Sequence, residues 1–168
     1  MSTRCQITVV QEEAGWDEKI TMYHHCDGYP EHIIEDLMTT YTGLMVRKEY
    51  APGLFASSEW QAGRAGKVAA YLCATHPAGF EPEAGHDLHG DILFHYTLYL
   101  KNHKGGCMDD KPTWEVEIRE LGGGLERRLE GMVVTTKRTP LEKLAQEYCK
   151  KQKAKAYDRM DDPKKPFR

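Results

Sequence analysis

Residues 23–31, Tyr-His-His-Cys-Asp-Gly-Tyr-Pro-Glu, constrain the fold most strongly, because the hydrophobic period of the chain changes within them. Before this stretch, residues 3–10 and 19–25 alternate between apolar and polar side chains, which predicts a hairpin of two half-buried strands. After it, apolar residues recur at helical spacing through about residue 47, and Pro30 stands where a helix tolerates a missing N–H. The stretch therefore predicts a strand, a tight turn and a helix in succession.

The remaining segments predict a two-layer α+β domain with the element order β-β-α-α-β-β-β-α. Consecutive strands with short turns favour antiparallel pairing, so we expect about five mostly antiparallel strands with the helices on one face. Residues 91–101 are apolar at nearly every position, which predicts a central strand covered on at least part of both faces. The expected strands lie near 3–10, 19–25, 91–101, 114–119 and 125–136, and the expected helices near 30–47, 58–75 and 140–156.

The 168 residues are enough for one hydrophobic core, and we expect a single domain over 1–156 followed by a charged tail over 157–168. Charge is unevenly distributed: residues 1–136 contain 12 Lys and Arg against 21 Asp and Glu, whereas 137–168 contain 11 against 5. No apolar run approaches the roughly 20 residues needed to span a bilayer, and no secretory signal is visible. A cytoplasmic location without membrane association is the expectation.

Five scattered cysteines form no CxxC pair, so neither a zinc ribbon nor a redox dithiol is indicated. We expect them to be reduced and mostly packed as small apolar side chains. A nucleophilic role is the alternative for Cys26, which is flanked by His25 and Asp27, and for Cys5 beside Arg4. Neighbours in sequence do not by themselves give the geometry of a catalytic triad.

Histidine and aspartate residues gather in two segments, 24–27 and 86–95, which makes both candidates for metal or ligand binding. If the strand near 91–101 lies beside the hairpin, the two segments meet. Imidazole and carboxylate groups are ligands that zinc and manganese accept, although no HExxH motif occurs. The alternative is that the aspartates cap turns while the histidines form local hydrogen bonds. The candidate ligand or metal cluster is His25, Asp27, His89 and Asp91, with Arg4, Tyr29 and His95 as supporting residues.

Nucleic-acid binding is a further candidate function. Aromatic and cationic side chains on an open sheet face can stack bases, and the basic segment 137–168 would attract phosphates. Against this, Glu115 and Glu117 are expected on the same face, where they would repel a nucleic acid. No phosphate-binding glycine loop, dinucleotide fingerprint or nucleophile elbow occurs in the sequence, so catalysis is less expected than binding.

Three motifs resemble a family of small, functionally uncharacterised proteins of bacteria, phages and prophages. They are Thr3-Arg4-Cys5-Gln6-Ile7, Asp27-Gly28-Tyr29-Pro30-Glu31 and His89-Gly90-Asp91-Ile92. Members of that family begin (Ser/Thr)-Thr-Arg-Cys-x-Ile and carry an x-Asp-Gly-Tyr-Pro-Glu turn. The resemblance covers about the first 35 residues and the segment near residue 90. It implies a phage or mobile-element setting and no particular activity.

These observations predict a non-catalytic binding or regulatory protein that acts on a host macromolecule, such as an anti-defence factor. A protein is the expected partner, with nucleic acid as a second candidate through residues 137–168. A metal-dependent hydrolase that uses the His/Asp cluster, with zinc or manganese as cofactor, is the alternative.

Overall fold

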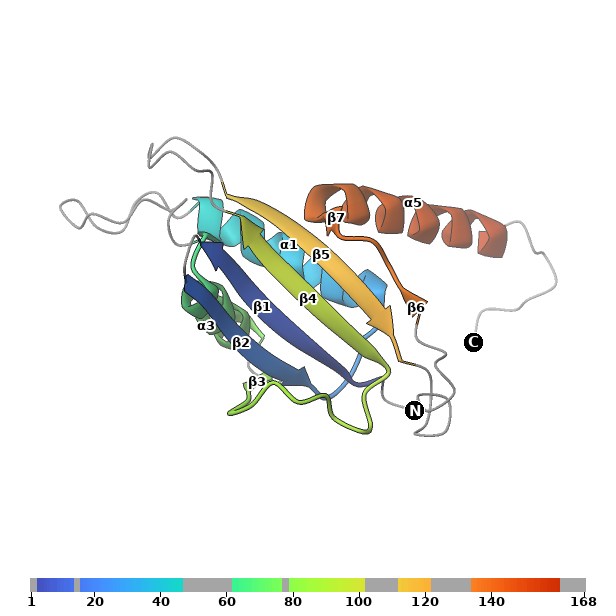
Figure 1. Cartoon of the computed structure of the whole chain (residues 1–168). Coiled ribbons are helices and arrows are strands. Elements are labelled where there is room, and N and C mark those ends of the chain that lie inside the picture. Colours follow the sequence, from blue (N-terminus) through green and yellow to red (C-terminus); the bar gives the residue numbers. More distant parts are fainter. Residues whose placement is uncertain are drawn as a thin grey trace.

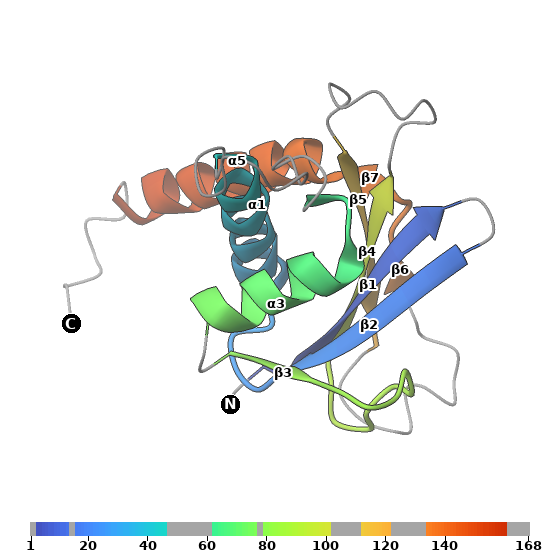
Figure 2. The same cartoon turned by 90° about the vertical axis from the view of Figure 1, so that its left-hand side faces the viewer.

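The computed structural model describes residues 3–13, 16–46, 62–76, 79–101, 112–121 and 134–160, which form a mixed β-sheet and helices (Figure 1). The strands are β1 (Cys5–Glu13), β2 (Trp16–His24), β3 (Phe80–Pro82), β4 (Phe94–Lys101), β5 (Thr113–Glu120), β6 (Val134–Thr135) and β7 (Thr139–Pro140). The helices are α1 (Pro30–Val46), α3 (Ala65–Thr75) and α5 (Leu141–Met160). Figure 2 shows these helices together on one face of the sheet, so the predicted α+β class is confirmed.

The strand order across the sheet is β3-β2-β1-β4-β5-β6, and β7 also pairs with β5. Antiparallel pairing predominates, but the central strands β1 and β4 run parallel, so the sheet is mixed. The predicted count of about five strands and the predicted element order along the chain are not matched exactly, because β3 and β7 are additional strands. The hairpin places β2 on one side of β1, and α1 and α3 then carry the chain across the helical face. β4 consequently enters on the other side of β1 and runs in the same direction.

Two strands that the sequence did not predict are very short. β3 has three residues in a segment rich in Gly and Pro, and β7 has two residues that were assigned to the start of the last helix. Neither is long enough to show an alternating pattern. Of the strand expected near 125–136, only β6 falls within the described residues. The first part of the helix expected near 58–75 also lies outside them.

The hydrophobic core lies between the sheet and the helices. Alternate residues of β1, β4 and β5 point toward the helices and are buried, as their period of two predicts. Two polar contacts attach the start of α3 to the sheet: Ala65 N donates to Gln11 Oε1 at 3.2 Å, and Trp114 Nε1 donates to Ala62 O at 2.8 Å. Core residues of the sheet include Cys5, Ile7, Val9, Tyr96, Leu98, Leu100, Trp114, Val116 and Ile118, and those of the helices include Ile33, Ile34, Leu37, Leu44, Val68, Leu72, Leu141 and Leu144.

Gly28 joins the turn after β2 to the beginnings of β1 and β4. Its N–H donates to Thr3 O at 2.9 Å, and its carbonyl accepts from the buried Tyr96 hydroxyl at 2.8 Å. A Cβ at this position would lie 2.7 Å from Cys5 Cβ, so the close approach requires glycine. The preceding residue, Asp27, takes a left-handed conformation with φ of 56°. This turn fixes where α1 begins, one residue after Tyr29.

We predict that Gly28→Ala destabilises the fold by about 1–3 kcal/mol, because the added methyl group has to displace β1 backbone and a buried side chain. Gly90→Ala is the matched control, since a Cβ there meets no atom within 4 Å. Urea unfolding followed by circular dichroism gives both values. Equal free energies of unfolding for the two variants would contradict the packing described here.

Candidate functional site

The sheet face opposite the helices carries a layer of buried polar side chains. Tyr23, Gln6 and His95 stand side by side on β2, β1 and β4, and Thr21 and Thr8 form the next row. Gln6 is fully buried and His95 is 8% exposed, although none of the described helices covers this face. A polar layer with so little solvent contact differs from the charged outer face of an ordinary two-layer domain.

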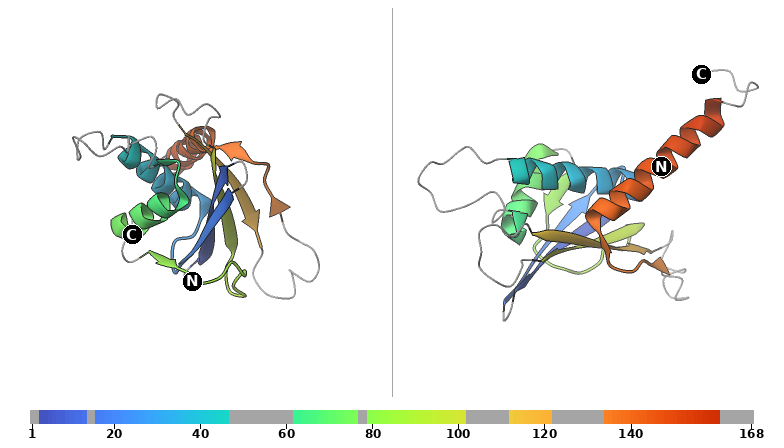
Figure 3. Two further views of the ribbon diagram at one scale, coloured as in Figure 1. Left: turned by 60° about the vertical axis from the view of Figure 1, so that its left-hand side comes forward. Right: turned by 90° about the horizontal axis from the view of Figure 1, so that it is seen from above.

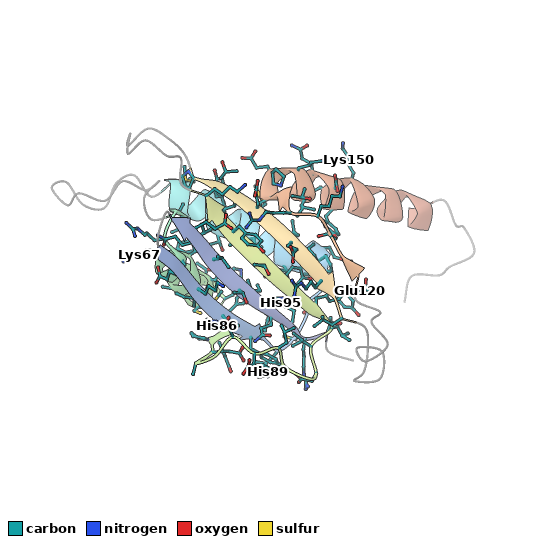
Figure 4. All side chains as sticks on the ribbon, viewed as in Figure 1. Lys67, His86, His89, His95, Glu120 and Lys150 are labelled. Carbon is teal, nitrogen blue, oxygen red and sulfur yellow. The ribbon has the colours of Figure 1, made fainter. Side chains whose placement is uncertain are left out.

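Residues 83–91 (the cover segment) fold over one end of this face, on the side where Figure 4 shows His86 and His89. Gln6 Nε2 donates to the Glu83 carboxylate and to the carbonyl of Asp87 at 3.0 Å. His86 Nδ1 lies 2.7 Å from Thr21 Oγ1, and the backbone N–H of Glu83 donates to Thr21 O at 2.9 Å. Polar contacts to β1 and β2 thus hold the cover segment in place.

Asp91 ends the cover segment and connects it to two strands. Its Oδ2 lies 2.6 Å from Arg4 Nη1 and accepts a hydrogen bond from Tyr23 Oη at 2.9 Å. Although burial alone would raise it, the Tyr23 hydroxyl and the Arg4 guanidinium hold the pKa of Asp91 below its usual value. Burial, together with the Asp91 carboxylate, raises the pKa of Tyr23 to about 12. Tyr23 therefore remains a protonated donor at neutral pH.

A hollow of about 530 Å³ lies between the end of β2, β3 and the cover segment. The Tyr23 ring lies between two imidazoles, with its centroid 4.7 Å from that of His25 and 4.9 Å from that of His89. Each histidine pairs with a glutamate: His25 Nε2 is 3.1 Å from Glu81 Oε2, and His89 Nε2 is 2.5 Å from Glu83 Oε1. The residues that line this hollow (the acidic pocket) are Tyr23, His25, Glu81, Pro82, Glu83, Ala84, Gly85, Asp87 and His89.

The acidic pocket has three carboxylates, from Glu81, Glu83 and Asp87, and neither lysine nor arginine among its described lining residues. The neighbouring Arg4 is paired with Asp91. The electrostatic character of the pocket is therefore negative. Such a site favours a cationic ligand, and its aromatic rings can lie against a planar guanidinium group.

Of the residues predicted from the sequence, the structure brings His25 and His89 together around Tyr23 and places Asp91 next to Arg4. Two others lie elsewhere. Tyr29 is 44% exposed in the turn before α1, with its ring centroid 6.1 Å from that of Phe94. Asp27 occupies the left-handed position of the same turn.

His95, the last of the predicted supporting residues, lies within the polar layer. Its Nε2 is 3.0 Å from Thr8 Oγ1, while its buried Nδ1 has no hydrogen-bond partner among the described residues. Burial, with a smaller contribution from Arg119, lowers the pKa of His95 to about 4. The buried Oε1 of its neighbour Gln6 also has no hydrogen-bond partner in the part of the chain that the structure describes. Two adjacent strands therefore each leave one buried polar atom unsatisfied on this face.

Sequence reasoning missed Glu81 and Glu83, which supply much of the negative charge of the acidic pocket. They lie in and directly after β3, in a segment assigned to a loop. The sequence Glu81-Pro82-Glu83 was visible, but its role depends on β3 pairing with the end of β2. That pairing is a long-range contact without a local signal.

Metal binding and cysteine chemistry receive no support from the geometry. Among the described residues, no group of three or more His, Cys, Asp or Glu side chains could hold a metal ion. His25 and His89 pair with different glutamates. Burial, followed by the nearby Asp36 charge, strongly raises the pKa of the Cys5 thiol, which disfavours a thiolate there.

Comparisons with protein-family models, with curated proteins and with solved structures found no match. The site is therefore interpreted from its own geometry. In the part of the chain that the structure describes, no helix combines the length and the apolar character required to cross a membrane.

We predict that His95→Gln reduces the pH dependence of stability between about pH 6.5 and about pH 4. The folded-state pKa of His95 lies below its ordinary value, so the unfolded chain binds more protons in this window. The free energy of unfolding of the wild type therefore falls as the pH falls, with up to about 3 kcal/mol from this residue.

Urea unfolding at several pH values measures this slope for both proteins. His24, whose pKa burial also lowers, contributes a slope that the variant retains. The quantity compared is the slope of the unfolding free energy against pH. The free energies themselves also differ at every pH, because the substitution removes the contact between His95 and Thr8. Identical slopes for the wild type and the variant would contradict the burial of an uncharged His95.

Proposed function

We propose that this chain is a non-catalytic binding protein whose acidic pocket holds a lysine or arginine side chain of a protein partner. The observation that carries the proposal is the set of three carboxylates around the Tyr23 ring, without a lysine or arginine among the described lining residues. An ammonium or guanidinium group would form charge-assisted hydrogen bonds with these carboxylates. The Tyr23 and histidine rings would provide aromatic surface beside it.

The distribution of charge supports a basic partner. Residues 1–136 have an excess of nine acidic residues, 21 against 12, so the body of the domain attracts cationic surfaces over a longer range. Two cations on the open sheet face are paired with neighbouring glutamates: Lys101 with Glu115 at 2.6 Å, and Arg119 with Glu117 at 3.2 Å. These pairs leave that face poorly suited to nucleic-acid phosphates.

Arg138, at the far end of the open face, is a further cation that contacts neighbouring side chains. Its guanidinium carbon lies 3.1 Å from the centroid of the Tyr99 ring, and its Nη2 lies 2.6 Å from Glu12 Oε1. The aromatic surface of Tyr99, which a base would need for stacking, is thus already covered by a side chain of the chain itself. These contacts favour a protein partner over a nucleic acid.

The resemblance to phage and mobile-element proteins adds a setting to this proposal. In that setting the partner is a host protein, and the chain modulates it by occupying a basic surface. The protonated state of Tyr23 and the burial of the Cys5 thiol are consistent with binding and supply neither a general base nor a nucleophile.

We predict that the capped tripeptide acetyl-Ala-Arg-Ala-amide binds in the acidic pocket and perturbs amide resonances of residues 81–89. The double variant Glu81→Gln/Asp87→Asn should weaken this binding by about tenfold or more, because two of the three pocket carboxylates lose their charge. NMR titration of the full chain measures both affinities. The acetyl-Ala-Glu-Ala-amide peptide should not perturb these resonances.

The control is Glu18→Gln/Glu120→Gln, which removes the same charge from exposed positions outside the pocket. Equal weakening by the control, or equal binding of the acidic peptide, would refute the proposed pocket function. Turnover of phosphoester or amide substrates by the purified protein would refute the non-catalytic interpretation.

A further inference from the structure

A second concavity, of about 660 Å³, lies on the helical face, on the other side of the sheet from the polar layer. Its floor is apolar: Ile34 and Met38 of α1, Tyr71 of α3, and Ala145 and Tyr148 of α5 line it. We call this concavity the helical groove. An apolar floor of this kind can receive the apolar side of a helical segment.

Among the side chains of α5 that the structure describes, those of its first turn pack most closely on the domain. Leu141 and Leu144 are buried against the core, whereas Glu147, Cys149 and Lys150 are exposed. In the right-hand view of Figure 3 the second half of α5 extends well beyond the sheet and the other helices. A helical segment of about ten residues is marginal in water by itself, so a partner surface would stabilise this half.

The charge of the projecting half complements the rim of the helical groove. Residues 150–160 contain five Lys and Arg and one acidic residue. The rim of the groove carries Glu31 and Glu35. Apolar residues Ala154, Tyr157 and Met160 recur in the projecting half at three-residue spacing, the pattern of a segment that packs through one side.

We propose that two copies of this chain form a twofold-symmetric dimer in which the projecting half of each α5 lies in the helical groove of the other copy. The groove begins beside Ala145, Tyr148 and Cys149, where α5 leaves its own domain. Two antiparallel α5 helices that cross near residue 149 therefore place each projecting half alongside the first half of the other. One symmetric contact fills both grooves and leaves no open end for polymerisation.

This arrangement brings the two Cys149 residues close to the twofold axis. Cys149 is a free and exposed thiol. Its crosslinking across the axis is thus a specific signature of antiparallel α5 pairing, because two cysteines form a disulfide only when their Cα atoms approach within about 7 Å. The acidic pocket lies on the other side of the sheet and does not take part.

Sedimentation equilibrium of the full chain, over about 1 to 500 µM, measures the proposed dimer. We expect a reversible monomer–dimer equilibrium that weakens at high salt. Glu31→Lys/Glu35→Lys should raise the dissociation constant at least about tenfold, because the rim then repels the basic half of α5. Glu12→Lys/Glu18→Lys changes the net charge equally at exposed residues that do not line the groove, and should dimerise as the wild type does.

Thermal melting confirms that each variant is folded. Disulfide crosslinking under mild oxidation is a second test, and it needs no change of charge. Oxidation should yield a dimer linked through Cys149, identified by peptide mass spectrometry and absent in Cys149→Ser. A chain that is monomeric at all these concentrations would overturn the proposal, whether the groove is filled by its own residues or by another protein. A dimer that both charge-reversal pairs weaken equally, or that crosslinks without Cys149, would overturn it too.

The proposed pocket function and the proposed dimer can be tested independently. Glu81→Gln/Asp87→Asn should leave the dimerisation constant unchanged, because neither residue lines the helical groove. Loss of dimerisation in that variant would contradict the placement of the interface.

Discussion

The close packing of Gly28 against Cys5 is the constraint on which the rest of the structure depends. It allows the turn after β2 to bond to the backbone just before β1, and it places the Gly28 carbonyl under the hydroxyl of Tyr96 in β4. The starts of β1, β4 and α1 thereby meet at one point. Arg4 follows Thr3 at this junction, which explains how it reaches Asp91 and, through Asp91, Tyr23.

Local patterns were sufficient to predict which way the side chains of the hairpin point. The alternation of residues 19–25 correctly placed Met22 toward the core and Tyr23 toward the open face, and helical spacing located α1 to within about a residue. The parallel neighbourhood of β1 and β4 could not be predicted, because it depends on how the intervening helices cross the sheet. The sequence did suggest that His25 and His89 lie close together. It did not indicate their glutamate partners, Glu81 and Glu83, because those positions also depend on long-range contacts.

The polar layer under the cover segment reduces the stability of the domain. Within the described residues, Gln6 Oε1 and His95 Nδ1 are buried without hydrogen-bond partners, and each such group costs about 1–3 kcal/mol. Apolar side chains at these positions would avoid that cost. The retained polar groups instead order the cover segment through Gln6, whose amide contacts Glu83 and Asp87. The buried polar groups therefore lower the stability of the domain, while Gln6 positions the residues that form the acidic pocket.

The described sheet has edges that resist the addition of a further strand. At one edge, β3 covers only the end of β2 and contains Pro82, which has no N–H to donate. The adjoining part of β2 carries the exposed charges of Glu18 and Lys19. At the other edge, β6 and β7 pair with β5 in two separate pieces of two residues each. Neither edge offers a long, uncharged backbone ladder on which amyloid-like stacking or strand exchange could begin. Such edges disfavour pairing between the sheets of different copies of this chain.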